Sequence, residues 1–283
     1  MKLENYLSLQ NQYRSLSVLD SVTYKGVTYP IYATKTIPDP SLPTLVITGG
    51  CHGLEKIGVK IVLQFLEQFE NKNQSINLAC IPCLNPYGLV HNQRSNGNGV
   101  DLMRNSPDKN KPGEFFLGGQ TWSNRLPYYK GSNNLEQENI IWQKYLKETY
   151  DTTTGSIFIV DVHSGFGAKT FIWPTNSSKQ KRNENLFNVY ERVAWSNKMT
   201  YQEIPYRVSG DMLDYLYEQS PHQRTAIATM EIGTWKWLCK SPWRALRVIN
   251  WFNPPQKVES QVIDRHVKAL ADLEQVIQGI IKI

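Results

Sequence analysis

Two side chains that can bind a metal ion stand three residues apart near position 50. They are His52 and Glu55, in the segment TGGCHGLE of residues 48–55. An imidazole nitrogen and a carboxylate oxygen are two of the three protein ligands of a catalytic zinc site, whose fourth position is left to water. A histidine that is merely hydrogen-bonded to a carboxylate at a helix start has the same pattern. The pair therefore predicts a metal site only together with a third ligand.

A third candidate ligand, His163, follows the apolar run of residues 156–162. Such a run is typical of a strand that is buried on both faces. The alternative is that His163 only ends the strand. Asp101 and Asp161 are available to accept hydrogen bonds from ligand imidazoles, and metal-bound histidines usually have such partners. His52, Glu55 and His163 are therefore our candidate zinc ligands.

A carboxylate, Glu231, interrupts the apolar run of residues 225–234. Burying an ionised carboxylate in a strand costs several kcal/mol unless it is paired or open to a cleft. A structural salt bridge is one explanation of Glu231. The other is a general base beside a metal ion, since that role requires a raised pKa.

Two arginines lie in a long stretch without periodicity, residues 89–131. Long irregular stretches inside compact domains are more often functional than not. Arg94 and Arg104 stand there among small polar residues, and a guanidinium group offers a planar, bidentate fork to a carboxylate. The stretch therefore predicts an anion-binding loop, with an ordinary solvent-exposed loop as the alternative.

Strands and helices that alternate along the chain must position these side chains. This order predicts the α/β class, in which ligands bind at the carboxyl ends of the strands. Strands are predicted at 22–29 and 31–34 (a hairpin with its turn at Lys25-Gly26), 43–47, 76–81, 156–162, 170–173 and 225–234. Helices are predicted from near 53 to 69 and at 134–150, 185–195, 211–218 and 258–281, and residues 237–252 are expected to pack against the body.

The length of 283 residues predicts one domain over 1–283, with an N-terminal arm and hairpin at 1–40 and a C-terminal packing helix at 258–283. No run approaches the roughly 20 apolar residues of a membrane span, and the first residues lack the apolar core of a secretory signal. We therefore expect a cytoplasmic protein without a membrane partner. The cysteines at 51, 80, 83 and 239 are expected to be buried thiols.

The formal net charge is +6, but the lysines and arginines are dispersed. Their densest cluster, residues 179–182, favours a solvated helix start over a nucleic-acid groove. We therefore expect no nucleic-acid partner. The oligomeric state cannot be predicted from these patterns.

Taken in order over residues 44–233, the motifs resemble the zinc carboxypeptidase family, which includes deacylases of the aspartoacylase and succinylglutamate desuccinylase kind. His52-x-x-Glu55 and His163 resemble its zinc ligands, and Glu231 resembles its catalytic glutamate. Segments 85–88, 94–96 and 99–105 resemble its substrate-binding segment, and 206–214 resembles the loop with its mobile tyrosine and specificity pocket. Residues 129–131 with 136–138 resemble a signature of its shorter members, and residues 86–88 and 231–234 fit an uncharacterised bacterial branch better than the digestive enzymes. The resemblance implies a three-layer α/β/α fold around a central mixed, mostly parallel, twisted sheet.

The resemblance also implies a mechanism that uses one Zn²⁺ per chain. His52, Glu55 and His163 would hold the ion, which acidifies a water molecule and polarises the scissile carbonyl. Glu231 would take the proton of that water and return it to the leaving amine. Arg94 would stabilise the oxyanion, a contribution of roughly 3 kcal/mol in other enzymes.

The resemblance places four further residues in substrate binding. Arg104 would bind the terminal carboxylate within the segment that includes Asn105, and Tyr206 would close over it. Leu213 matches the position that sets side-chain selectivity, and its apolar character argues against a basic substrate side chain. Met103 stands where the family normally has an asparagine that helps to bind the carboxylate.

Three functions are consistent with these residues. The first is a carboxypeptidase-like hydrolase that acts on a peptide or peptide-like C-terminus. The second, slightly favoured by Met103, is a deacylase of N-acyl amino acids. The third is a zinc-binding protein without catalysis, and the retained ligands and Glu231 argue against it.

Overall fold

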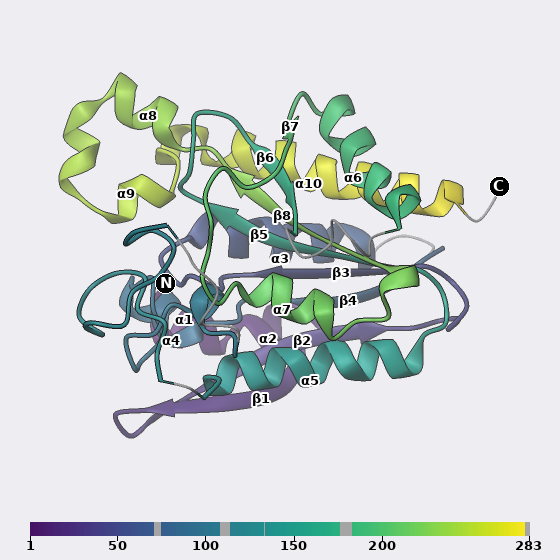
Figure 1. The fold of residues 1–283 in the computed structure, drawn as a ribbon, viewed down its shortest axis with the longest axis horizontal. Helices are drawn as coiled ribbons and strands as arrows, with labels where there is room; N and C mark the ends of the chain where they lie inside the picture. Colours follow the sequence, from purple (N-terminus) through teal and green to yellow (C-terminus); the bar gives the residue numbers. More distant parts are fainter. Residues whose placement is uncertain (71–74, 108–113, 133, 176–182, 281–283) are drawn as a thin grey trace.

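A computed structural model describes residues 1–70, 75–107, 114–132, 134–175 and 183–280. Its centre is one eight-stranded sheet in the order β1-β2-β4-β3-β5-β8-β6-β7 (Figure 1). The strands are β1 (Ser17–Tyr24), β2 (Val27–Thr36), β3 (Thr44–Gly49), β4 (Asn77–Ile81), β5 (Ile157–Ser164), β6 (Phe171–Pro174), β7 (Thr200–Tyr201) and β8 (Thr225–Ile232). β4, β3, β5 and β8 run parallel to one another. The pairs β1–β2, β2–β4 and β6–β8 are antiparallel, so the sheet is mixed, as predicted.

Helices pack on both faces of this sheet. One group, α3, α6 and α10, packs together, and α5 and α7 lie on the other side of the sheet (Figure 1). The helices are α1 (Leu3–Leu7), α2 (Leu9–Gln12), α3 (Lys56–Glu70), α4 (Pro86–His91), α5 (Gln137–Thr152), α6 (Glu184–Ser196), α7 (Met212–Glu218), α8 (Trp235–Lys240), α9 (Ile249–Phe252) and α10 (Gln256–Ile280). The described residues also form the short 3₁₀ helices η1 (Leu102–Arg104), η3 (His222–Arg224) and η4 (Pro242–Leu246).

The central strands β3 and β5 are buried along their whole length. Their apolar, β-branched residues fill both faces, which is what strands covered by helices on two sides require. In the parallel ladder Gly49 pairs with Val162, and His163 pairs with Glu231 of β8. The carboxyl ends of these three strands therefore meet at one edge of the sheet, as predicted.

The hairpin at the N-terminal side is also confirmed. Its turn residues Lys25 and Gly26 both have positive φ angles, 52° and 77°. Two residues of this kind are what a two-residue hairpin turn demands.

Four local expectations were wrong. The helix after β3 begins at Lys56 and not near residue 53, so Glu55 directly precedes it. The segment 86–91 is a short helix, α4, because Asn85 caps it and Pro86 suits the first turn. Residues 237–252 pack against the body only in part: Trp237 contacts the hydrophobic core, but α8, η4 and α9 contain no buried residue. Cys239 is exposed, whereas the other three cysteines are buried.

Other expectations stay predictions. The basic cluster of residues 179–182 lies outside the described residues, and the single-domain boundaries and the cytoplasmic location are untested. Within the described part of the chain, no helix is both long and apolar enough to cross a bilayer.

Candidate active site

Glycines shape the turn that delivers His52 and Glu55. Gly50 has a φ of +61°, a conformation that L side chains rarely adopt. Gly53 lies so close to α4 that a Cβ atom there would sit 1.9 Å from the carbonyl carbon of Gly88. The backbone therefore turns sharply after β3, and the His52 carbonyl accepts a hydrogen bond from the Glu55 backbone N–H at 3.0 Å. Both side chains leave this turn on the same side.

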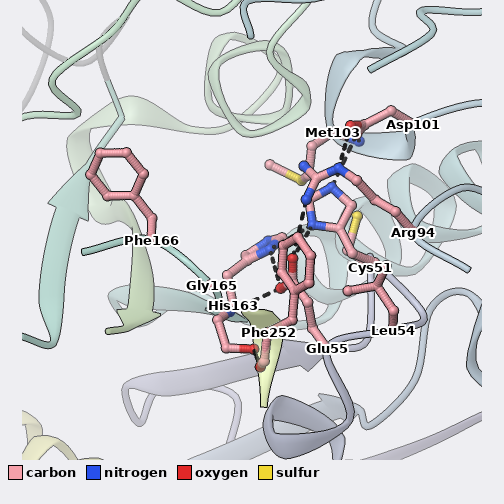
Figure 2. Close-up of polar contacts among 12 residues, drawn as sticks. Cys51, Leu54, Glu55, Arg94, Asp101, Met103, His163, Gly165, Phe166 and Phe252 are labelled. Carbon is pink, nitrogen blue, oxygen red and sulfur yellow. Dashed lines mark hydrogen bonds and ion pairs between the residues drawn. The ribbon is translucent and has the colours of Figure 1, made fainter. Parts of the chain in front are cut away.

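The structure brings the three candidate metal ligands together. His52 Nδ1 lies 2.8 Å from Glu55 Oε1, and His163 Nδ1 lies 3.1 Å from Glu55 Oε2. The two Nδ1 atoms are 3.2 Å apart. Two ligand atoms on a tetrahedral zinc ion are separated by about 3.3 Å, since each bond is about 2.0–2.1 Å long. The donor set and its spacing therefore fit a zinc ion. Figure 2 shows Glu55 and His163 converging.

Two aspartates determine which ring nitrogens are free. His52 Nε2 lies 3.0 Å from Asp101 Oδ1, and His163 Nε2 lies 2.5 Å from Asp161 Oδ2. A carboxylate accepts hydrogen bonds, so each Nε2 carries a proton and each Nδ1 presents a lone pair when the ring is neutral. Two buried lone pairs 3.2 Å apart repel each other unless a cation or a proton lies between them. A hydrogen bond from the second ring nitrogen to a carboxylate is the usual support of a metal-bound histidine.

The electrostatics of the ligands agree with a cation site. Burial opposes ionisation of Glu55, but His52 and His163 nevertheless hold the pKa of that carboxyl below its ordinary value. Burial also disfavours a charged His163, yet Asp161 and Glu55 raise the pKa of its imidazole well above the ordinary value. The site therefore accumulates negative charge that a proton or a metal ion must balance.

A second group of potential ligands consists of Cys51, Asp161 and His163. Burial raises the pKa of the Cys51 thiol well above its ordinary value, with Asp161 adding to the shift. A thiol that keeps its proton is a poor ligand. In addition, Asp161 already binds His163 Nε2. The first group is therefore the better metal site.

Glu231 lies in the same cleft as the three ligands. Its Oε1 accepts a hydrogen bond from the Phe166 backbone N–H at 2.8 Å. Burial, followed by the charge of Glu55, raises the pKa of Glu231 to about 8. The Glu231 carboxylate makes no ion pair among the described residues, so a structural salt bridge does not explain its burial.

Arg94 and Arg104 are both anchored by Asp101. Arg94 Nε donates to Asp101 Oδ2 at 2.8 Å, and an Arg94 terminal nitrogen donates to Glu55 Oε1 at 3.3 Å. Arg104 donates to Asp101 Oδ2 at 3.2 Å and to the Leu117 carbonyl at 2.8 and 3.0 Å. Both guanidinium groups lie over the ring of Tyr128. Asp101 thus connects His52 to both arginines, as Figure 2 shows for Arg94.

These residues line a cleft of about 540 Å³. Tyr206 lines it near Arg104. Burial raises the pKa of the Tyr206 hydroxyl, and the positive charge of Arg104 opposes that rise. Much of the wall is aromatic or apolar, and the lining residues are His52, Glu55, Arg94, Met103, Arg104, Leu117, Tyr128, His163, Ser164, Gly165, Phe166, Trp173, Ile204, Tyr206, Val208, Asp211, Thr229, Glu231, Trp235, Leu238, Cys239, Trp251 and Phe252.

Two predicted substrate-binding residues do not line this cleft. The Asn105 side-chain amide donates to the Lys130 carbonyl at 3.0 Å, and its oxygen accepts from the Glu136 backbone N–H at 2.7 Å. Asn105 therefore holds the loop that carries Arg104. Leu213 is buried in the hydrophobic core. Neither Asn105 nor Leu213 is therefore placed to contact a substrate in the cleft.

Asp211 lines the cleft where Leu213 does not, and sequence reasoning missed it. Its Oδ1 caps α7 by accepting from the backbone N–H groups of Leu213 and Asp214 at 2.9 and 3.1 Å. Burial and the neighbouring Asp214 raise the pKa of Asp211 to about 7. An aspartate before a helix is ordinarily interpreted as a cap, so the sequence held no signal for a second role. Tyr128 was missed as well, because nothing in an irregular loop distinguishes one tyrosine.

A second groove, of about 820 Å³, continues from the first. The two share Arg94, Tyr128, Trp251 and Phe252. The second groove is richer in amides, which come from Asn92, Gln93, Asn96, Asn98 and Asn124. The metal ligands therefore lie within a long cleft and not in a closed pocket.

Known proteins resemble this chain in sequence and in fold. A family model described as Protein of unknown function (DUF2817) matches residues 38–114 and 113–273. The carboxypeptidase N catalytic chain of Mus musculus is 34% identical over 120 residues, which cover 34% of this chain and 24% of that protein. This chain thus spans about a quarter of the length of the curated relatives that it matches.

Solved structures extend the comparison to nearly the whole chain. Carboxypeptidase A from Helicoverpa armigera has a TM-score of 0.69 at 16% identity, over 97% of this chain and 71% of that one. The murein-tripeptide amidase from Escherichia coli O157 has a TM-score of 0.59 at 16% identity, over 92% of this chain and 91% of that one. At such identities the likeness establishes the fold, and the predicted carboxypeptidase-like fold is confirmed.

Proposed function

We propose that this chain, which belongs to the family described as Protein of unknown function (DUF2817), is a metal-dependent hydrolase of amide bonds. The observation that carries the proposal is the convergence of three ligand atoms, His52 Nδ1, His163 Nδ1 and a Glu55 oxygen, beside Glu231 in one cleft. The fold shared with carboxypeptidase A and with a murein-tripeptide amidase supports it.

His52, Glu55 and His163 would hold the metal, and zinc fits their nitrogen and oxygen donors. When bound, such an ion acidifies a water molecule and polarises a carbonyl oxygen. Asp101 and Asp161 keep the two imidazoles oriented with Nδ1 toward the ion. This support matters because a ligand that rotates away from its working position weakens both binding and catalysis.

Glu231 is the proposed general base. Its raised pKa makes it a ready proton acceptor, since a base works best when its pKa lies near the working pH. It would take a proton from the attacking water and pass it to the nitrogen of the leaving amine. The Phe166 backbone N–H fixes one carboxylate oxygen and leaves the other for this transfer.

Arg94 and Arg104 divide two further tasks. Arg94 lies 3.3 Å from Glu55 through a terminal nitrogen, which is close enough to the ligands to stabilise an oxyanion at the scissile carbon. Arg104 lies beside Tyr206 and spends three of its five N–H donors on Leu117 and Asp101. The others are available to a substrate carboxylate. The bond cleaved is therefore an amide near a carboxylate.

The long cleft favours an extended substrate. A single N-acyl amino acid would occupy only the part around the metal ligands and Arg104. The amide-rich second groove continues on the Arg94 side and suits a peptide or peptide-like chain that extends beyond the scissile bond. A deacylase of N-acyl amino acids is the second candidate, because Met103 contributes an apolar side chain to the cleft beside Arg104.

Zinc-loaded protein should release the C-terminal residue from peptides with a free carboxylate, and it should act far more slowly on the same peptides with an amidated end. Activity on N-acyl amino acids alone would move the assignment to the second candidate. Glu231→Gln should lower kcat by about 10²–10⁴-fold without loss of bound zinc, and the exposed Glu148→Gln is the matched control. Unchanged turnover in Glu231→Gln would remove Glu231 from the mechanism.

A further inference from the structure

Large apolar side chains are exposed along residues 235–252, which we call the aromatic rim. Four of the eight tryptophans of the chain lie in these 18 residues. At its outermost part Trp243 is 81% exposed, Leu246 82% and Val248 63%. Single exposed apolar residues are ordinary, but a contiguous group of this size marks an interaction surface.

The aromatic rim is also strongly basic. It contains Lys236, Lys240, Arg244 and Arg247 and no acidic residue. Among the described residues, no carboxylate forms an ion pair with Lys236, Lys240 or Arg247. Much of the +6 net charge of the chain is thus concentrated beside its exposed tryptophans.

The rim is firmly attached at both ends to the catalytic edge of the sheet. The Thr234 hydroxyl donates to the Trp251 carbonyl, and the Ser164 hydroxyl donates to the Phe252 carbonyl at 2.6 Å. Asn253 accepts from the Ile57 backbone N–H at 3.1 Å. Between these anchors the segment projects from the body, as α8 and α9 show in Figure 1. The exposed side chains are therefore presented by a supported structure.

A second set of exposed apolar residues lies on loops that contribute to the same cleft. Leu117 lines one part of the cleft and Leu126 lines the other. The rings of Phe115 and Trp122 contact each other at a tilt of 47°, with centroids 5.6 Å apart. Phe115 is 82% exposed. Figure 1 places the loops of residues 90–107 and 114–130 at the same end of the molecule as α8 and α9. Apolar side chains of the aromatic rim and of these loops therefore both border the cleft.

We propose that the aromatic rim docks the protein on the surface of an anionic lipid bilayer, with the mouth of the cleft toward that surface. Tryptophan is the side chain that best suits the boundary between headgroups and acyl chains. Exposed leucine and valine gain by entering that boundary, and neighbouring lysines and arginines are attracted by anionic headgroups.

Two other occupants fit less well. A nucleic acid would use the positive charge but would leave Leu246 and Val248 without a favourable contact. A second copy of this chain in a symmetric dimer would bring the same basic rim against itself, so that like charges would meet. The bilayer uses both the apolar and the basic groups. Our expectation of no membrane partner rested on the lack of a membrane-spanning run, and surface docking needs none.

The test is cosedimentation of the purified full chain with lipid vesicles. Vesicles of phosphatidylcholine with phosphatidylglycerol should bind the protein, and vesicles of phosphatidylcholine alone should bind it about 10-fold more weakly or less. Trp243→Ala with Leu246→Ala should weaken binding to anionic vesicles by at least about 10-fold. Lys240→Glu with Arg247→Glu should do the same. Trp195→Ala is the matched control, because Trp195 is 89% exposed on α6, away from the rim.

The variants change residues that do not line the cleft. Hydrolysis of a small soluble substrate should therefore be unchanged in them. For this reason a failure of the docking proposal can be told apart from a failure of the proposed function. Absence of binding to anionic vesicles would overturn the proposal. So would rim variants that bind like the unchanged protein. Equal displacement by a soluble polyanion without any effect of Trp243→Ala would indicate a polyanion site. A dimer in sedimentation analysis that the rim variants dissociate would indicate self-association.

Discussion

At the scale of single residues, the candidate site depends on which nitrogen of each histidine is free. Asp101 and Asp161 accept hydrogen bonds from the Nε2–H groups, so the Nδ1 atoms of His52 and His163 both point at the same place. Asp161 is itself held, because the Thr48 hydroxyl donates to its other oxygen at 2.7 Å. The aspartates therefore organise the site before any metal arrives.

This account predicts that Asp161→Asn weakens zinc binding by about 10–100-fold, because the imidazole of His163 loses its charged acceptor. Competition with a chelator of known affinity measures the effect. Asp264→Asn, on the exposed surface of α10, is the control and should bind zinc like the unchanged protein. Equal zinc affinity in Asp161→Asn and in the control would show that this aspartate does not support the site.

Sequence reasoning found His163, Asp161 and Glu231 because each stands at the end or in the interior of an apolar run, where a charged or polar side chain needs a reason. It found His52 and Glu55 by their spacing, and it proposed Asp101 as an available hydrogen-bond acceptor. It did not identify Asp211 or Tyr128. The first is indistinguishable from a helix cap, and the second from any loop tyrosine. Asn105 and Leu213 were predicted by position in a motif, and their contacts turn out to lie within the protein.

At the scale of elements, the turn between β3 and α3 is the part that tolerates least change. Gly53 touches the backbone of α4, and a backbone cannot yield as a flexible side chain does. Gly53→Ala should therefore lower the free energy of unfolding by about 3 kcal/mol. Urea unfolding measures this. Gly279→Ala is the control, since a Cβ there meets nothing within 4 Å, and it should stabilise α10 by up to about 1 kcal/mol. Equal stability of the two variants would contradict the close approach of α4.

The junction of α10 and β6 makes folding sensitive to acid. His266 is buried, accepts a hydrogen bond from the Thr170 hydroxyl at 2.8 Å and donates to the Val262 carbonyl at 2.6 Å. Burial lowers the pKa of His266 to about 4 from 6.5. Between these values the unfolded chain binds a proton that the folded chain does not, so stability falls as the pH falls from 6.5 to 4 and levels off below 4.

The loss from His266 should be about 3 kcal/mol over that interval. Urea unfolding at pH 6.5 and at pH 4, in the unchanged protein and in His266→Gln, isolates the contribution of His266 to this loss of stability. Glutamine keeps the hydrogen-bonding groups but does not titrate. The variant should lose correspondingly less stability on acidification. The same acid loss in both proteins would mean that His266 is protonated in the folded state.

The elements themselves were largely predictable, because the strands are continuous apolar runs and the long helices have clear periodicity. Residues 237–252 were the main exception. Their tryptophans and leucines suggested a packing element, but apart from Trp237, which contacts the core, most of them lie near the surface. Sequence alone does not reveal this, because it depends on how much interior the sheet and the other helices leave. α4 was hidden because its six residues are too few for periodicity to show.

At the scale of the whole molecule, three features lie at one end. The metal ligands, the two-part cleft and the aromatic rim all belong to the carboxyl edge of the central strands or to the segments that follow them. The fold was predictable through the motifs that resemble the zinc carboxypeptidases. The continuity of the cleft was not, since it depends on how loops near residues 94, 128 and 251 meet in space.

The central claim is that His52, Glu55 and His163 hold one metal ion beside Glu231. Anomalous X-ray diffraction from crystals of the zinc-loaded protein, collected at the zinc absorption edge, tests it most directly. The account predicts one strong peak about 2.0–2.2 Å from His52 Nδ1, from His163 Nδ1 and from a Glu55 oxygen. No peak among these three side chains, or a peak bound by other residues, would contradict it.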